Sequence, residues 1–153
     1  MPRIISDAID AYPFRKVNAR VQFLVLRRRD DDLVGGLWQA VHGKIRPGEN
    51  TVTTVRREIA DHTGLTVSKL YTADFIAQFF DVTTDSLVLV PSFAAQVAVR
   101  AKPEIAAEFI DYAWCDLEET TARLATSSQR WAVRHIYDVI ALGGAESDQY
   151  EIV

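Results

Sequence analysis

A loop that leads into a short helix is the most restrictive feature of this sequence. The loop starts at Gly43, and Asn50 and Gly64 bracket residues 51–63 as a suitable N-cap and C-terminal stop. Apolar residues recur at helical spacing between those two ends: Val52, Val55 and Ile59. The sequence therefore predicts a helix over 51–63 that buries one stripe of side chains.

The exposed side of this helix carries side chains with metal-binding chemistry. Glu58, Asp61 and His62 share one face, because positions three and four apart are neighbours on a helix. Carboxylate oxygens beside loop carbonyls suit a hard cation such as Mg²⁺ or Mn²⁺. Glu49 can reach back to Arg57 and fix the loop against the helix through a charge-assisted pair. The competing interpretation is an ordinary solvated helix face.

The rest of the chain predicts a sheet with helices around it. Apolar and β-branched runs predict strands over 20–26, 37–41, 67–80, 86–99 and 112–115, and a hairpin loop at 81–85. A charged turn is expected at 27–32. Helices are expected over 117–124 and 127–142, the second with one apolar face: Trp131, His135, Val139 and Leu142. This order favours an α/β sandwich with a mixed sheet, in a single domain over 1–153 with a loose polar tail from about 143.

Composition excludes several classes of protein. The chain has 153 residues, which suits one domain, and its net charge of −4 argues against a nucleic-acid polymer as partner. The single cysteine, Cys115, permits no internal disulfide and favours a reducing, cytoplasmic setting. We expect no membrane association, because the most apolar stretch, 87–99, is short and interrupted, and the first residues lack a signal-peptide core.

The loop and helix resemble the Nudix box, a pattern of fixed spacing. The matching positions are Gly43, Glu49, Arg57, Glu58, Ile59, Gly64 and Leu65. The wider resemblance covers about residues 20 to 140 and is closest to the branch that acts on nucleoside or dihydroneopterin triphosphates. It implies a Nudix-type α/β/α sandwich and a metal-dependent hydrolase.

The resemblance also implies roles for individual residues. Metal would be held by the Gly43 carbonyl, Glu58, Asp61 and His62, with Mg²⁺ or Mn²⁺ as the cofactor. The catalytic set would be Glu58, Asp61 and Glu108, the last as an extra carboxylate shortly before the late strand, with Glu104 a weaker match. Glu49 and Arg57 would give structural support.

The chain departs from the family pattern in this site. Asp61 and His62 replace a pair of glutamates, so one anion is missing. An imidazole binds Mn²⁺, Zn²⁺ or Fe²⁺ but is a poor ligand for Mg²⁺. Phe109 stands where a histidine usually follows the extra glutamate.

Candidates for substrate contact lie before the box. Arg27 and Arg28 suit phosphate, but neighbours on a strand face opposite sides, so only one of them is expected to reach it. His42 could touch a phosphate or serve the structure. Trp38 and Phe80 could stack on a base or belong to the core.

Two further residues have structural interpretations. His135 is expected in the core and Cys115 is expected to be a small buried hydrophobe.

The leading hypothesis is a pyrophosphohydrolase of a small nucleotide-like substrate, with a nucleoside triphosphate as the first choice. The alternative is a catalytically silent Nudix domain that binds a nucleotide or a protein partner. A scaffold that serves mainly as a homodimer is a third possibility, for which the sequence shows no exposed apolar stripe.

Overall fold

The computed structural model describes residues 1–30 and 35–153. Asp31 and Asp32, part of the predicted charged turn, lie outside the described residues. The strands are β1 (Arg3–Ile5), β2 (Ala8–Val17), β3 (Arg20–Arg28), β4 (Trp38–Gln39), β5 (Val41–Lys44), β6 (Val67–Asp81), β7 (Ser86–Val97), β8 (Phe109–Cys115) and β9 (Glu151–Ile152). The helices are α1 (Thr51–Thr63), α2 (Leu117–Arg123), α3 (Ser127–Ile136), the π-helical turn η1 (Tyr137–Ala141) and α4 (Ala145–Asp148).

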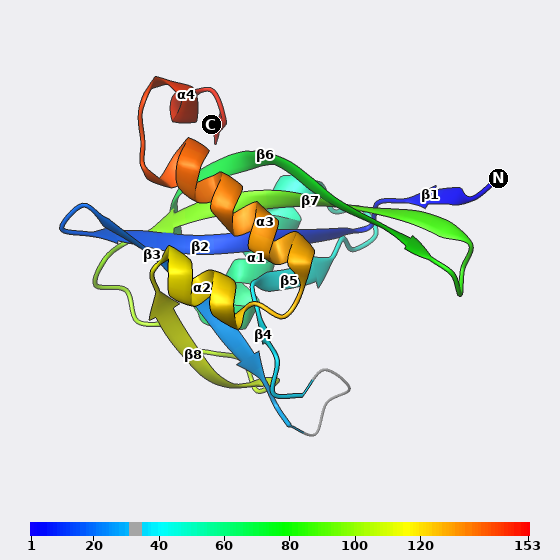
Figure 1. Cartoon of the computed structure of the whole chain (residues 1–153), viewed down its shortest axis with the longest axis horizontal. Coiled ribbons are helices and arrows are strands. Elements are labelled where there is room, and N and C mark those ends of the chain that lie inside the picture. The colour runs from blue at the N-terminus through cyan, green and yellow to red at the C-terminus, as the bar shows by residue number, and fades with distance from the viewer. Residues whose placement is uncertain (31–34) are drawn as a thin grey trace.

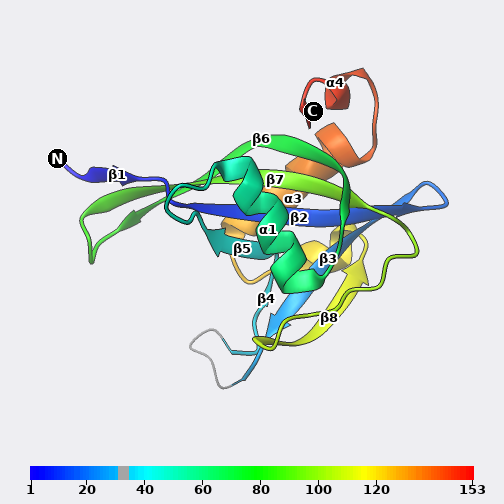
Figure 2. The same ribbon diagram turned by 180° about the vertical axis from the view of Figure 1, so that it is seen from behind.

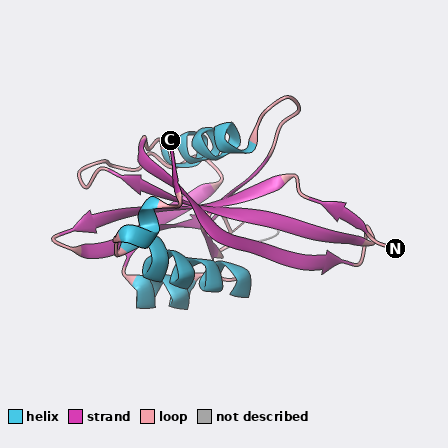
Figure 3. Ribbon diagram, turned by 90° about the horizontal axis from the view of Figure 1, so that it is seen from above, coloured by secondary structure: helices cyan, strands magenta, loops and turns pink. Residues whose placement is uncertain are grey.

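The described strands form one mixed sheet. Its main path runs β4-β3-β2-β7-β6-β9, with β1 on β7, β5 on β2 and β8 on β3. β7 pairs in parallel with β1 and β2, and the other pairs are antiparallel. α2 and α3 cover one face (Figure 1), and α1 covers the opposite face (Figure 2). Helices on both sides of the strands are also visible from above (Figure 3). The predicted α/β/α sandwich is confirmed.

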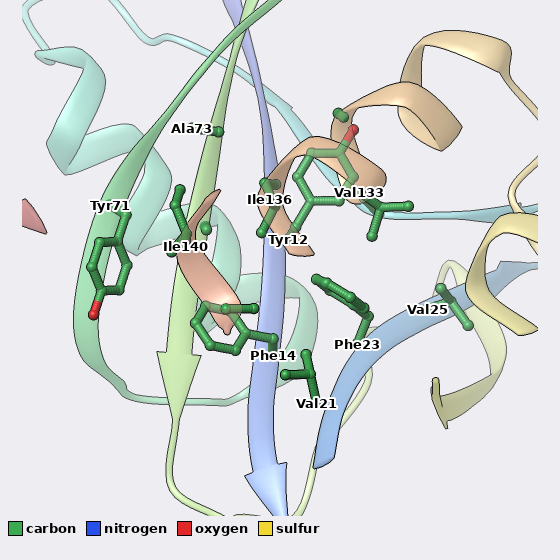
Figure 4. Close-up of a cluster of buried hydrophobic side chains, with 14 of the residues drawn as sticks. Tyr12, Phe14, Val21, Phe23, Val25, Tyr71, Ala73, Val133, Ile136 and Ile140 are labelled. Atoms are coloured by element: carbon green, nitrogen blue, oxygen red, sulfur yellow. The ribbon is translucent and has the colours of Figure 1, made fainter. Parts of the chain in front are cut away.

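Alternating side chains fill a core on each face of the sheet. In β3, Val21, Phe23 and Val25 belong to the core beneath α3. Figure 4 shows these side chains in one cluster with Val133 and Ile136 of that helix. Leu24 and Leu26 point the other way and join the core beneath α1. A sheet buried on both faces needs near-continuous apolar strands, which explains the composition of this segment.

The central strand β2 is absent from the sequence-based prediction. It contains Pro13, a residue that usually argues against a central strand. The structure accommodates it because β2 changes partners there: Ala8–Ala11 pairs with β5, and Phe14–Val17 pairs with β3. Pro13 lies between these two ladders, where the missing backbone N–H removes no antiparallel bond.

The C-terminal region corrects three expectations. Trp131 is 64% exposed and Leu142 54% exposed, so the predicted apolar face of 127–142 is wrong. The buried side chains are Ala132, Val133, Ile136, Ile140 and Ala141. Trp131 lies on the side of α3 that faces away from the sheet. After Ile136 the helix passes into η1, whose wider turn shifts the positions that follow, Leu142 among them. The tail expected to be loose forms α4 and β9, and Ile152 pairs with Leu70 of β6.

Smaller boundary differences follow from local pairing. The single strand expected over 37–41 is divided into β4 on β3 and β5 on β2. The strand expected over 86–99 ends at Val97. In the described part of the chain, no helix is long and apolar enough to cross a membrane.

Candidate active site at the loop and helix α1

Helix α1 has both of its predicted ends. The Asn50 side chain accepts a hydrogen bond from the Thr53 N–H at 2.9 Å, as an N-cap does. Gly64 has φ of 68°, a left-handed conformation that glycine adopts without strain, and its N–H donates to the Ala60 carbonyl. Val55 and Ile59 are fully buried against the sheet. Because Val55 and Ile59 are held against the sheet, the opposite side of α1 faces the loop that precedes the helix.

Glu49 and Arg57 form the predicted clamp between loop and helix. The guanidinium donates from Nε to Oε2 at 2.7 Å and from Nη2 to Oε1 at 2.8 Å, a bidentate pair. Nη2 also donates to the Lys44 carbonyl at 3.0 Å, which ties the end of β5 to α1. Hydrogen bonding from Arg57 holds the pKa of Glu49 well below its usual value, and the same pair raises the pKa of Arg57.

Gly43 permits the close approach of β5 and α1. A methyl group at this position would lie 2.2 Å from Cδ and 2.6 Å from Oε1 of Glu58. Any larger residue would therefore displace the Glu58 carboxylate. The requirement for glycine here is one of space between two elements.

Glu58, His62 and Glu108 come together at the end of α1. The imidazole Nε2 of His62 lies 2.9 Å from Oε1 of Glu108 and 3.3 Å from Oε2 of Glu58. The side chains of Glu58 and His62 are mostly buried, with 11% and 14% exposure, whereas Glu108 is 41% exposed. The ring of His62 also meets the Phe109 ring edge-on at 5.4 Å. A carboxylate distant in sequence is thus placed beside the box, where the resemblance implied it.

The segment before β8 is held in place by the last turn of α1. The Ala106 N–H donates to the His62 carbonyl at 3.0 Å, and the Glu104 N–H donates to the Thr63 carbonyl at 2.7 Å. These bonds satisfy carbonyls that a helix end leaves open. They also position Glu108, whose carboxylate reaches His62, whereas Glu104 takes part through its backbone N–H.

Asp61 is placed less centrally than the sequence suggested. Its side chain is 55% exposed and its Oδ2 lies 3.7 Å from Nη1 of Arg57. The same guanidinium nitrogen lies 2.5 Å from Oε1 of Glu58. Arg57 therefore connects both carboxylates to the clamp.

A divalent metal needs several oxygen or nitrogen donors that converge on one point. Within residues 1–30 and 35–153, no three His, Cys, Asp or Glu side chains form a ready-made metal cage. The chemistry still fits, because two carboxylates converge on one imidazole nitrogen and Gly43 leaves room for the Glu58 side chain against β5. Nδ1 of His62 is buried without a hydrogen-bond partner in the described part of the chain.

The predicted substrate residues lie around a pocket on the other face of β5. The pocket has a volume of about 340 Å³ and includes Arg28, Trp38 and His42 among its lining. Arg27 is not part of the lining; its Nε donates to the Gly36 carbonyl at 3.2 Å. Of the two arginines, Arg28 is therefore the one on the pocket wall. The Arg28 guanidinium lies 5.5 Å from the Phe109 ring centre, which links the pocket to the Glu108 segment.

Several residues of this pocket had no signal in the sequence. Gln129 and Thr126 reach it from the start of α3, and the Gln129 side chain accepts a hydrogen bond from the Ala40 N–H at 3.2 Å. The Arg123 guanidinium stacks over the Trp38 ring at 4.6 Å. These residues lie more than 80 positions from β4 along the chain, so only tertiary structure brings them together.

His42 has a structural partner that the sequence did not indicate. Its Nδ1 lies 2.7 Å from Oδ1 of Asp10, a carboxylate that is 5% exposed in β2. Hydrogen bonding to Asp10 raises the pKa of His42, although burial opposes the effect. The His42 side chain remains 46% exposed and lines the pocket. Its bond to Asp10 supports a structural role, and its exposure in the pocket supports a role in phosphate contact.

The three remaining candidates differ in burial. Phe80 is 49% exposed near the tip of the β6–β7 hairpin, neither in the core nor beside the pocket. His135 is half-buried and tilts against Phe75 at 6.2 Å. Cys115 is 1% exposed, which confirms its expected burial.

A second, larger hollow of about 590 Å³ lies away from the box. Its lining carries three acidic side chains, Asp116, Glu118 and Glu119, against one basic side chain, Arg20. Clustered carboxylates repel phosphate, so the pocket beside β5 is better suited to a phosphorylated ligand.

Comparison with known proteins identifies the family. The NUDIX domain model matches residues 7–136. The chain belongs to this family. Nudix proteins generally hydrolyse pyrophosphate bonds in derivatives of nucleoside diphosphates and use divalent metals.

Solved Nudix structures have the same fold as this chain. A NUDIX hydrolase of Listeria monocytogenes superposes with a TM-score of 0.73 at 24% identity, covering 86% of this chain and 92% of that one. An Ap4A hydrolase of C. elegans gives 0.72 at 18% identity, with 88% and 96% covered. The dihydroneopterin triphosphate pyrophosphohydrolase of E. coli gives 0.67 at 20% identity, with 83% and 91% covered.

This chain is also similar in sequence to part of a longer protein. An octanoyltransferase of Myxococcus xanthus is 29% identical over 140 residues. The match covers 84% of this chain but only 38% of that protein. The Nudix chain therefore spans well under half of the relative's length.

Proposed function

We propose that this Nudix chain is a metal-dependent pyrophosphohydrolase of a small nucleotide, with a nucleoside triphosphate as the leading substrate. The convergence of Glu58, His62 and Glu108 carries the proposal, because it places acid–base groups beside the loop that the box provides. Ap4A and dihydroneopterin triphosphate, named for structures of the same fold, are polyphosphates of the same chemical class.

The metal ligands would come from the box. Glu58, Asp61, His62 and the Gly43 carbonyl are the proposed set, for Mg²⁺ or Mn²⁺. When bound, such an ion neutralises charge on a diphosphate and makes water a better nucleophile. Asp61 requires a change of side-chain rotamer to join this set, which its 55% exposure allows.

The protein's own groups would handle the proton. Glu58 or Glu108 would accept the proton of the water that attacks phosphorus, because a general base must lie within hydrogen-bond reach of that water. Arg57 donates to Glu58 and is fixed by Glu49, so the clamp keeps the Glu58 carboxylate oriented. Arg57 is therefore proposed as a positioning residue for Glu58.

Substrate would bind across the end of β5. Arg28 and His42 lie on the pocket wall and can pair with phosphate oxygens. Trp38, already stacked under Arg123, offers an aromatic face to a base. The single buried thiol, Cys115, suits a reducing compartment such as the cytoplasm.

The test is turnover by the native chain and by Glu58→Gln. Phosphate release would be followed in Mg²⁺ and in Mn²⁺, with inorganic pyrophosphatase added for nucleoside triphosphates and, in separate assays, a phosphomonoesterase added for diphosphate-linked compounds. Glu58→Gln should remove turnover and leave the circular dichroism spectrum unchanged. Substantial remaining activity in that variant would contradict the assignment.

A second candidate rests on the hydrogen bonding of His62. Its Nε2 faces two carboxylates at once, an arrangement that can persist without any metal. In that case the chain would be a catalytically silent Nudix domain that binds a nucleotide or a protein partner. Nucleotide binding with no turnover in either metal, and turnover only in His62→Glu, would favour this candidate.

A further inference from the structure

Asp10 is a buried carboxylate in the centre of the sheet. It lies in β2 between β5 and β7 (Figure 1), with His42 and Ser92 opposite it on those strands. In the part of the chain that the structure describes, Asp10 at 5% exposure and Glu58 at 8% are the only buried acidic residues. Arg57 pairs with Glu58, whereas no described arginine or lysine pairs with Asp10. Burial of a carboxylate is unfavourable without such a partner, so the position of Asp10 requires an explanation.

The bond to His42 is the one hydrogen bond that the described residues make with this carboxylate. Nδ1 of His42 lies 2.7 Å from Oδ1 of Asp10, a length typical of a charge-assisted bond. The imidazole is itself 46% exposed, and ion pairs with an exposed partner contribute little to stability. The pair is therefore a weak source of stability for a group at this depth, which points to a role in the pocket that His42 lines.

The bond determines which atom of His42 is presented to the pocket. Because Nδ1 is occupied by Asp10, Nε2 is the ring nitrogen that stays available to a ligand, and no described residue bonds to it. The pocket of about 340 Å³ also has Arg28 in its lining. A carboxylate on one imidazole nitrogen holds the ring in one orientation and one tautomer, as it does in many functional histidines.

The register of β2 and β5 connects this histidine to the box. Ile9 lies opposite Gly43, and Asp10 lies opposite His42. Neighbouring residues of a strand face opposite sides of the sheet, so Gly43 meets Glu58 on the α1 face while His42 lines the pocket on the other face. A group held on a rigid strand keeps its geometry better than one on a loop. The ladder thus keeps His42 and Glu58 in a constant relative position.

We propose that Asp10 is a positioning residue, which holds His42 so that Nε2 donates a hydrogen bond to a phosphate oxygen of the substrate. A ring that donates from both nitrogens is positively charged, and the Asp10 carboxylate balances that charge within the sheet. This role rests on the proposed function, because it requires a phosphorylated ligand in the pocket. Asp10 itself does not touch the substrate, so its effect on binding passes through His42.

Calorimetric titration with inorganic triphosphate, without divalent metal, measures the phosphate contact in the absence of turnover. Asp10→Val and Asp10→Asn each remove one negative charge, which by simple electrostatics would strengthen the binding of an anion. We expect weaker binding instead. The loss should be about tenfold or more for Asp10→Val, the usual effect of a lost hydrogen bond to a charged group. It should be smaller for Asp10→Asn, which keeps an oxygen acceptor for Nδ1.

Asp7→Val is the matched control for the lost charge. Asp7 also connects the start of β2 to β5, because its carboxylate lies 3.1 Å from Nζ of Lys44. Its side chain is 52% exposed and does not contact His42. The affinity of Asp7→Val for triphosphate should therefore equal that of the native chain.

A combination with His42→Ala shows whether Asp10 acts through the imidazole. The double variant Asp10→Val with His42→Ala should bind triphosphate as weakly as His42→Ala alone, because the effects of residues that act through each other do not add. Urea unfolding gives a second signature. His42→Ala leaves a buried carboxylate without its partner and should be less stable than the native chain. Asp10→Val removes the buried charge and should be at least as stable as the native chain.

Nitrogen-15 spectra of the imidazoles report the orientation of His42 without any ligand. The chain has three histidines, so the signals that disappear in His42→Ala belong to His42. Nδ1 of His42 should carry a proton in the native chain, and the ring should exchange between tautomers in Asp10→Val. This measurement needs only a folded chain, so it also applies if triphosphate binding is weak.

Three results would overturn the role of Asp10. These are native affinity in Asp10→Val, a further loss of affinity when the two changes are combined, and a native chain that does not bind triphosphate. A marked loss of stability in Asp10→Val would assign Asp10 to the fold instead. The hydrolase assignment fails separately: a chain that shows the expected binding pattern but never cleaves a nucleotide keeps Asp10 as a positioning residue and loses the proposed reaction.

Discussion

The imidazole Nε2 of His62 lies 2.9 Å from the carboxylate of Glu108, although the two residues are 46 positions apart in the sequence. His62 belongs to α1, and Glu108 precedes β8 on a segment bonded to the carbonyls at the end of that helix. The contact adds an external carboxylate to a Nudix box that has lost one of its own.

Removing the charge of Glu108 should impair catalysis without affecting the fold. We expect Glu108→Gln to lower kcat by about 10²- to 10⁴-fold, the usual contribution of a general acid–base group. The side chain is 41% exposed, so stability should change little. Glu104→Gln is the matched control, since that residue contributes backbone contacts on the same segment. Steady-state kinetics measure the effect, and equal loss in both variants would exclude a specific role for Glu108.

His62→Glu should change which metal the site prefers. A glutamate restores an anionic oxygen ligand, which Mg²⁺ favours over an imidazole. We expect the affinity for Mg²⁺ to rise by at least about tenfold relative to Mn²⁺. Calorimetric titration of each metal in the absence of nucleotide measures the ratio. His62→Gln, which restores no charge, should leave the ratio nearer to that of the native chain.

Gly43→Ala tests the spatial requirement at β5. The added methyl group would lie 2.2 Å from Cδ of Glu58, so the carboxylate or the strand must move. Overpacking of this kind costs about 1–3 kcal/mol of stability, and we expect activity to fall as Glu58 is displaced. Lys44→Ala, at the neighbouring exposed position, should have little effect on either quantity. Urea unfolding and turnover are the measurements.

The clamp should make part of the stability depend on pH. The pKa of Glu49 is lowered in the folded chain by Arg57, so this pair contributes stability fully above the unfolded value of 4.5. The contribution is lost as pH falls from there toward the lower folded pKa. Glu49→Gln should therefore be less stable than the native chain at pH 7, and the difference should shrink in acid. If the difference in urea midpoint between the native chain and Glu49→Gln stayed constant with pH, the ion pair would not be the source of the pH dependence.

Trp38→Ala should weaken binding of the nucleoside more than it affects chemistry. Stacking of a base on an aromatic side chain is worth about 1–3 kcal/mol, so KM for a nucleotide should rise roughly tenfold or more with a smaller change in kcat. Trp131→Ala is the matched control. That indole also lies under an arginine, Arg134, but it is 64% exposed on α3 and does not line the pocket.

Local signals in the sequence were sufficient to predict α1 and its surroundings. Asn50 and Gly64 marked the helix ends because capping depends on residues next to the helix. Glu49 and Arg57 met as expected because their spacing returns the loop to the first turns of α1. Glu108 could be placed only through the family resemblance, since nothing in its own neighbourhood indicates a contact with His62.

Features that depend on tertiary pairing were missed or misjudged. Strand β2 was not predicted, because Pro13 argues against a central strand. The change of pairing partner that accommodates Pro13 depends on the arrangement of the whole sheet. In α3 the buried positions are Ala132, Val133 and Ile136 and not Trp131, a choice that depends on which side of the helix meets the sheet.

Comparison of turnover by the native chain and by Glu58→Gln tests the central claim most directly, with each nucleoside triphosphate offered in Mg²⁺ and in Mn²⁺. The account predicts pyrophosphate release by the native chain with at least one nucleotide, and none above background by the variant despite an unchanged fold. Equal rates for the two proteins, or a native chain that binds nucleotide but never cleaves it in either metal, would contradict it.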